Sequence, residues 1–285
     1  MQQLNDPLAG VQADDGRYRV YDHGAQVCAW RPADDPRPVL WMSSASAFTP
    51  GKAIRGGIPI CFPWFGPGLS EDKKPAHGFA RTTSWRRVAA AQSDGVLTVE
   101  YAIDPELTGE QPEFPHRYEA SLTAVFADDH LEVSLRARNT GDQPFTFEEA
   151  LHTYLVVSDV HDVTIEGLDG ATYCDKLADS PGFDSVQQGD LRLSGPIDSV
   201  FEHHQAVAIS DPGYGRRLVL SSSGASNVVV WNPWESGAAG MADMGPGEWS
   251  GMVCVEAGNV LNGAVTLEPG EDWTISQRIE VHPLR

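Results

Sequence analysis

Two arginines and a histidine stand at the ends of an aromatic, proline-rich segment that runs from residue 55 to residue 81. The segment begins RGGIPICFPWFGP and closes with HGFAR, so Arg55 opens it and His77 and Arg81 close it. Its prolines remove backbone donors at spacings that exclude a helix interior and a central strand, which predicts a shaped loop. Aromatic faces beside fixed donors suit a sugar, and two arginines suit an anion. The alternative is a loop that plugs one end of a β-sandwich, with the arginines capping loop carbonyls.

A histidine and a glutamate further along the chain could supply acid and base chemistry. In an expected strand over 145–157, alternation places Glu148 and His152 on one face, roughly 13 Å apart along the strand, too far for a direct pair. Glu256 stands among apolar and small neighbours in MVCVEAG, so its strand is expected to be buried. Burial raises the pKa of a carboxyl group, as a general base near neutral pH requires. A satisfied structural histidine and a structural salt bridge are the respective alternatives.

The elements that would carry these residues are strands, because the dominant hydrophobic period is two. Segments 85–90 and 96–103 flank Ser-Asp-Gly and predict a hairpin, and segments 120–126 and 131–138 predict another. Further strands are expected at 163–166, 206–209, 217–221, 227–231, 251–256 and 273–281. Residues 179–195 are expected to form a long surface excursion. Many short strands with polar turns predict an all-β fold, a large antiparallel β-sandwich that spans residues 1–285 as one domain.

Composition limits the partners and the compartment. With 40 acidic and 20 basic residues, the net charge of −20 argues against nucleic acid and anionic membrane, and a phosphorylated substrate would need a local island of basic residues. The first residues show no leader pattern, and no apolar run approaches membrane-spanning length, so a cytoplasmic protein is expected. Four cysteines are scattered without ligand spacing, which favours reduced, buried thiols over disulfides or a zinc site; they are Cys28, Cys61, Cys174 and Cys254.

Six motifs together resemble the aldose 1-epimerase superfamily, and specifically its hexose-6-phosphate mutarotase branch. They are RGGIPICFPWFG at 55–66, HGFAR at 77–81, EEALHTYL at 148–155, TYCDKL at 172–177, VVVWNPWE at 228–235 and VCVEAGNV at 253–260. The resemblance implies the galactose-mutarotase-like supersandwich. It implies a catalytic histidine at His152, a catalytic base at Glu256 and substrate contacts from His77. By the same resemblance Asp175 fixes a sugar hydroxyl, and Arg55 and Arg81 bind the phosphate.

The implied reaction interconverts the α and β anomers of a hexose 6-phosphate, glucose 6-phosphate first, through acid–base ring opening. It needs no cofactor or metal, and a monomer that binds a small sugar phosphate is expected. Two other classes stay open: a sugar-phosphate binding protein without catalysis, and a glycoside hydrolase or polysaccharide lyase. The latter would draw on the carboxylates Glu148, Glu149, Asp175 and Glu256.

Some residues near the motifs receive no firm role from the sequence. Lys73 and Lys74 could supplement a phosphate site or simply solvate the loop. Trp231 and Trp234 could offer a stacking wall, although core packing is the usual role of tryptophans in such a strand. Asp243 follows the same motif without an assigned function.

Overall fold

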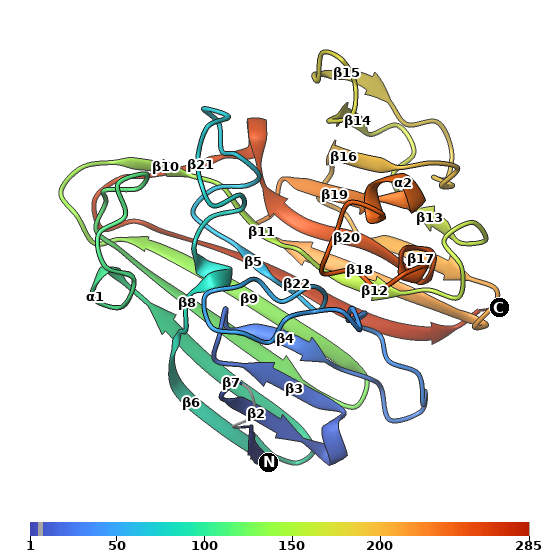
Figure 1. The fold of residues 1–285 in the computed structure, drawn as a ribbon, viewed down its shortest axis with the longest axis horizontal. Coiled ribbons are helices and arrows are strands. Elements are labelled where there is room, and N and C mark those ends of the chain that lie inside the picture. Colours follow the sequence, from blue (N-terminus) through green and yellow to red (C-terminus); the bar gives the residue numbers. More distant parts are fainter. Residues whose placement is uncertain (5–7, 285) are drawn as a thin grey trace.

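Two large antiparallel sheets, packed face to face, form the body of the molecule in the computed structural model, which describes residues 1–4 and 8–284 (Figure 1). We name each sheet after its central strand. The β22 sheet has the order β13 (Thr164–Glu166), β17 (Val207–Asp211), β18 (Arg216–Ser223), β22 (Asp272–Pro283), β9 (His130–Asn139), β8 (Tyr118–Phe126), β7 (Val96–Ile103) and β6 (Arg86–Ser93). The β20 sheet has the order β15 (Phe183–Val186), β14 (Thr172–Asp175), β16 (Ile197–Glu202), β19 (Asn227–Asn232), β20 (Met252–Asn259), β11 (Glu149–Leu151) and β5 (Ile60–Cys61), and β12 (Tyr154–Val156) also pairs with β20.

Smaller elements complete the fold. A four-stranded N-terminal sheet contains β1 (Gln2–Leu4), β2 (Gly10–Ala13), β3 (Tyr18–Tyr21) and β4 (Gln26–Ala29), and a two-stranded ribbon joins β10 (Phe145–Phe147) to β21 (Val265–Leu267). The described α-helices are short, α1 (Pro105–Thr108) and α2 (Trp234–Ala238). Single turns of 3₁₀-helix are η1 (Asp14–Gly16), η2 (Ala80–Thr82), η3 (Glu248–Gly251) and η4 (Leu261–Gly263).

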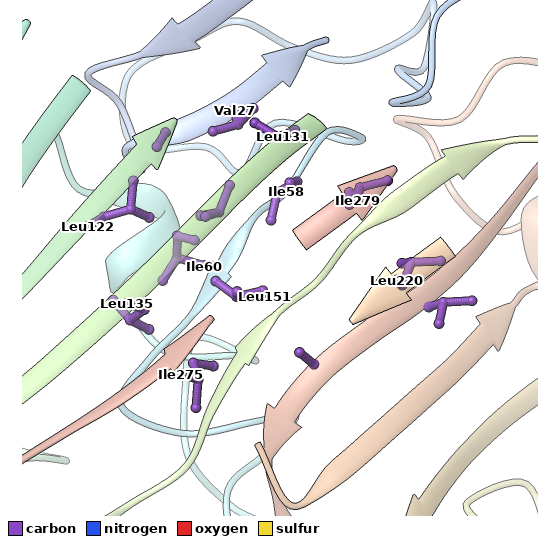
Figure 2. Close-up of a cluster of buried hydrophobic side chains, with 14 of the residues drawn as sticks. Val27, Ile58, Ile60, Leu122, Leu131, Leu135, Leu151, Leu220, Ile275 and Ile279 are labelled. Atoms are coloured by element: carbon purple, nitrogen blue, oxygen red, sulfur yellow. The ribbon is translucent and has the colours of Figure 1, made fainter. Parts of the chain in front are cut away.

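The main core lies between the two large sheets. Figure 2 shows aliphatic side chains of both sheets in one cluster, among them Leu151 and Ile60 from the β20 sheet and Leu135 and Ile275 from the β22 sheet. Along β20, alternate residues such as Val253 and Val255 enter this core, as the period of two requires. The intervening residues of β20 therefore point to the outer face of their sheet.

The predicted all-β antiparallel sandwich is confirmed, and the strand at 96–103 has the expected bounds. The single strand expected over 145–157 is wrong, because the chain forms three short strands there: β10 pairs with β21, whereas β11 and β12 pair with β20. At the breaks its backbone donors bond the 55–81 loop instead of a sheet neighbour: the N–H of His152 donates to Pro59 O and that of Tyr154 to Gly57 O. The segment 179–195, which was expected to be a long surface excursion, contains a short strand, β15, that pairs with β14.

Candidate active site

A pocket of about 320 Å³ opens on the outer face of the β20 sheet. It brings together side chains from the 55–81 loop and from strands that are far apart in the sequence. The lining residues are Arg55, Phe65, Ala76, His77, Arg81, His152, Lys176, Asp198, Trp231, Met241 and Glu256. Five of the six site residues predicted from the sequence are in this set.

The register of β12 against β20 brings His152 and Glu256 together. Tyr154 pairs with Cys254, and the strands run antiparallel, so the residue two positions before Tyr154 comes to lie beside the residue two positions after Cys254. The resulting distance from His152 Nε2 to Glu256 Oε1 is 3.4 Å. Both side chains are buried, His152 with 6% and Glu256 with 1% of its surface exposed.

Burial disfavours the charged form of each member of this pair. Desolvation raises the pKa of Glu256 well above its ordinary range, and the nearby Asp198 carboxylate adds to that rise. Desolvation lowers the pKa of His152, and the positive charges of Arg81 and Arg55 lower it further. Neither oxygen of Glu256 has a hydrogen-bond partner within the part of the chain that the structure describes. The pair is therefore poised to exchange protons with a molecule that enters the pocket.

The hydrogen bonds of His77 indicate which of its nitrogens carries the proton. Its Nδ1 lies 3.3 Å from the backbone N–H of Gly66, which can only donate, and 3.4 Å from the Cys61 sulfur. Burial, followed by the charge of Arg81, lowers the pKa of His77, so the ring is neutral. A neutral ring whose Nδ1 accepts must carry its proton on Nε2, which makes Nε2 a hydrogen-bond donor.

The loop that holds His77 depends on close backbone approach. His77 and Gly78 both have left-handed backbone conformations, with φ of 65° and 74°. A Cβ atom at position 78 would lie 2.0 Å from Phe62 O, so only glycine fits there. At the other side of the loop, the Glu148 carboxylate accepts from the N–H groups of Phe65 and Leu261 at 3.2 and 2.8 Å. These contacts fix the aromatic loop to the β20 sheet.

Three cationic side chains line the pocket, and they differ in the number and kind of their hydrogen-bond and ion-pair partners. Arg55 donates to Asp243 from Nε and Nη2, at 3.1 and 3.2 Å, and to the Tyr154 hydroxyl from Nη1 at 2.9 Å. Lys176 forms an ion pair with Asp198 at 3.3 Å. Arg81 bonds the Ala76 carbonyl at 2.8 Å and has no carboxylate partner among the described residues.

Asp175 lies outside the pocket. It borders a neighbouring cavity with Tyr173 and Ser199, and its Oδ1 accepts from the N–H of Leu177 at 2.9 Å. The next residue, Lys176, faces the pocket instead. Of this Asp-Lys dipeptide, the structure brings Lys176 to the pocket and not the predicted Asp175.

The sequence analysis also missed Asp198 and Met241. Asp198 lies opposite Trp231 across the β16–β19 ladder, and both side chains line the pocket. Nothing in the local sequence of Asp198 marks it, because only the sheet order brings it beside Lys176. Trp231 itself lies on the wall, with its ring centroid 6.0 Å from that of His152.

Other residues without an assigned role lie away from the pocket. Trp234 packs on Trp249, with ring centroids 4.9 Å apart. Lys73 donates to the Glu113 carbonyl and lies over the ring of Trp64. Neither Lys73 nor Lys74 is part of the pocket wall.

Comparison with known proteins agrees with this geometry. The family model described as aldose 1-epimerase matches residues 11–280. The chain belongs to the aldose 1-epimerase family. It is 35% identical over 266 residues to a Cenchrus ciliaris protein provisionally named glucose-6-phosphate 1-epimerase, covering 89% of this chain and 78% of the relative. An Escherichia coli protein with the same provisional name is 32% identical, with 90% and 87% covered.

The fold is shared with solved structures as well. A Salmonella typhimurium crystal structure, provisionally titled a mutarotase, superposes with a TM-score of 0.83 at 26% identity, covering 99% of this chain and 96% of the other. The predicted family and the supersandwich are thereby confirmed. Among the described residues no helix is long and apolar enough to cross a membrane.

Proposed function

We propose that this chain is an isomerase that interconverts the α and β anomers of hexose 6-phosphates, with glucose 6-phosphate as the preferred substrate. The observation that carries the proposal is the buried pair of His152 and Glu256, 3.4 Å apart at the pocket wall, beside three cationic side chains. The relatives named glucose-6-phosphate 1-epimerase support the same substrate class. The organisation as one monomeric, cytoplasmic domain stays a prediction.

The reaction requires one proton to leave the anomeric hydroxyl and one to reach the ring oxygen. In the reactive form Glu256 is a carboxylate and His152 an imidazolium. Glu256 takes the proton from O1, the bond from C1 to the ring oxygen breaks, and His152 gives its proton to the ring oxygen. The open aldehyde rotates about the C1–C2 bond and closes on its other face by the reverse transfers. Protons balance, because the pair gains one and loses one in each half.

The electrostatics of the pocket fit this sequence of states. After ring opening Glu256 is a neutral acid and His152 a neutral base, which are the forms that burial favours. Desolvation therefore lowers the free energy of the open-chain state relative to the closed one. A bound phosphate dianion would counter the effect of Arg81 and Arg55 on His152 and help to restore the imidazolium for the first step.

Four other side chains would hold the sugar. The Nε2–H of His77 can donate to a sugar oxygen, and Lys176 and Asp198 offer a donor and an acceptor from the opposite wall. We assign the hydroxyl contact to Asp198 instead of Asp175, because only the Asp198 side chain lines the pocket. Trp231 presents an aromatic wall for an apolar sugar face.

The phosphate would bind to the arginines of the loop. Arg81 has no carboxylate to displace, so most of its donors are available to an anion. Arg55 donates three hydrogen bonds to Asp243 and Tyr154, and these bonds orient its guanidinium. Its remaining N–H donors are available to the phosphate.

The four carboxylates that the sequence offered to a hydrolase or lyase do not meet in the pocket. Glu148 is committed to two backbone N–H groups, and Glu149 bonds Asn259 in the interior. Of the carboxylates considered from the sequence, only Glu256 reaches the pocket. Release of reducing ends from oligosaccharides would nevertheless overturn the proposed function.

Anomer exchange measured by magnetisation-transfer NMR on glucose 6-phosphate tests the proposal. His152→Ala and Glu256→Gln are expected to abolish the acceleration, while His204→Ala, which removes an exposed histidine, keeps it. Near wild-type exchange in both folded site variants would refute the assignment. Binding of glucose 6-phosphate by the wild type without any acceleration would favour a binding protein. Parallel measurements on glucose, galactose 6-phosphate and mannose 6-phosphate would rank the substrates.

A further inference from the structure

Two residues that line the pocket, His152 and Glu256, lie close to the buried side chain of Cys254. His152, Cys254 and Glu256 each offer one ligand atom, and these atoms lie within 4.8 Å of one another. Cys254 and Glu256 are two residues apart on β20 and share its outer face, while the β12 register supplies His152. A cysteine and a histidine about one hundred residues apart carry no ligand spacing, so no sequence motif reveals this cluster.

The cluster is buried, and some of its polar atoms lack hydrogen-bond partners among the described residues. All three residues are buried, in contrast to the exposed acidic groups that gather at many surfaces without binding a cation. Neither oxygen of Glu256 has a hydrogen-bond partner in the described part of the chain, and the oxygens are fully enclosed. A buried carboxyl group without partners is costly, and a cation would remove that cost.

We propose that His152, Cys254 and Glu256 form a binding site for a divalent cation of the zinc class, and that the bound cation inhibits anomer exchange. Imidazole nitrogen, thiolate sulfur and carboxylate oxygen are the ligands that Zn²⁺ takes, in tetrahedral geometry. A water molecule would complete the tetrahedron as the fourth ligand. The ion would occupy the lone pairs that the acid–base reaction needs, so zinc would be an inhibitor and not a cofactor.

The distances permit this geometry with small movements. Zinc bonds of about 2.0–2.3 Å place neighbouring ligand atoms of a tetrahedron roughly 3.2–3.6 Å apart. His152 Nε2 and Glu256 Oε1 already have that separation, at 3.4 Å. The separations of the Cys254 sulfur from the other two ligand atoms are at most 4.8 Å and would need to shorten by at most about 1.6 Å. Binding would release two protons to solvent, one from the Cys254 thiol and one from the Glu256 carboxyl group, and the thiolate and the carboxylate would then neutralise the two charges of the ion.

Cobalt(II) provides a direct readout of binding that does not depend on activity. Titration of the metal-free, reduced protein with Co²⁺ is expected to give a near-ultraviolet charge-transfer band from a cobalt–thiolate bond, which Zn²⁺ then removes. The band should be absent from Cys254→Ala and present in Cys28→Ala, a matched change at another buried free cysteine. Chelator competition should show that Cys254→Ala weakens Zn²⁺ binding by at least roughly 100-fold.

The second arm measures inhibition and rests on the proposed function. Zn²⁺ is expected to stop anomer exchange in the wild type at concentrations that match its measured affinity. Cys254→Ala should keep basal exchange and need at least roughly 100-fold more Zn²⁺ for the same inhibition. Mg²⁺, which prefers six oxygen ligands, should have no effect. If the protein shows no exchange at all, the cobalt spectrum still decides whether the site exists.

Two results would overturn the proposal. One is the absence of a thiolate band in the wild type, and the other is a band that persists in Cys254→Ala. If Cys254→Ala does not fold, Glu256→Gln serves as the second binding variant, and it should weaken Zn²⁺ binding by at least about tenfold. Unchanged affinity in that variant would also count against the site.

Discussion

Glu149 should make the stability of this protein fall as pH rises through the neutral range. The side chain is fully buried on β11, where Asn259 Nδ2 donates to its Oε1 at 3.0 Å and its Oε2 has no hydrogen-bond partner in the described structure. Desolvation raises the pKa of Glu149 from its ordinary value of 4.5 to about 8. The folded protein therefore holds this proton over a pH range in which the unfolded chain has lost it.

The sign and size of the effect follow from proton linkage. Between pH 4.5 and about 8 the folded state binds more protons at Glu149 than the unfolded state does, so the free energy of unfolding decreases as pH rises. The loss begins at the unfolded pKa and is complete above the folded one. At about 1.4 kcal/mol per pH unit, the whole interval corresponds to on the order of 5 kcal/mol. This figure is an upper bound, because water entry and local relaxation reduce the cost of a buried charge.

Glu149→Gln removes the ionisation and keeps a side-chain oxygen for Asn259. Near pH 5 the variant should have a free energy of unfolding close to that of the wild type. At pH 8.5 the variant should be more stable by several kcal/mol, up to the order of 5 kcal/mol. Urea unfolding followed by tryptophan fluorescence measures both curves, and Glu119→Gln, at an exposed position, is the control. A difference between variant and wild type that does not change from pH 5 to 8.5 would refute the reasoning.

Three further predictions address the site and its loop. Glu256→Gln should lose anomer exchange yet be at least as stable as the wild type above pH 5, because burial raises the pKa of Glu256 too; a clear loss of stability in urea unfolding would favour a structural ion pair. Arg55→Ala and Arg81→Ala should each lower kcat/KM on glucose 6-phosphate by at least about tens of fold, as expected for a loss of about 2–5 kcal/mol, with little change on free glucose. Added salt should weaken the wild type more than either arginine variant, and equal losses on both substrates would contradict a phosphate role. Gly78→Ala should destabilise the protein by about 3 kcal/mol or more, measured by thermal unfolding, because the new Cβ would meet Phe62 O at 2.0 Å; an unchanged midpoint would show that the loop can shift.

The sequence was informative wherever a segment pairs with its neighbour along the chain. The hairpin of β6 and β7 and that of β8 and β9 were predicted from alternation and turn residues, because such pairing is local. The N-terminal sheet and the strands β14 and β16 were missed. Residues 145–157 were predicted as one strand, because periodicity does not reveal that a strand changes partners.

The positions of single side chains in the site also depend on pairing between distant strands, which the sequence does not reveal. Glu256 was found from its own apolar neighbours, but its distance to His152 depends on the β12–β20 register, which no local pattern contains. Asp175 was predicted from the resemblance of its Asp-Lys dipeptide to the family motif, which does not show which of the two side chains faces the pocket. Strand alternation places Cys174 on one face of the sheet and Asp175 on the other, but only the pairing of β14 with β16 shows which face carries the pocket residue Asp198.

Glu149 and Glu256 are buried on neighbouring strands, and their difference explains why one is proposed to act in catalysis and the other is not. Burial raises the pKa of both. Glu149 is bonded to Asn259 and lies away from the pocket, so its proton can affect only stability. Glu256 lies on the pocket wall with both oxygens unpartnered among the described residues, so a substrate hydroxyl can supply the missing partner. Glu149→Gln should therefore change the pH dependence of stability and leave that of anomer exchange unchanged, whereas Glu256→Gln should abolish exchange. Replacing a buried glutamate by glutamine removes the free-energy cost of its ionisation in both cases. Activity is expected to survive this change at Glu149, which no substrate reaches, and to be lost at Glu256.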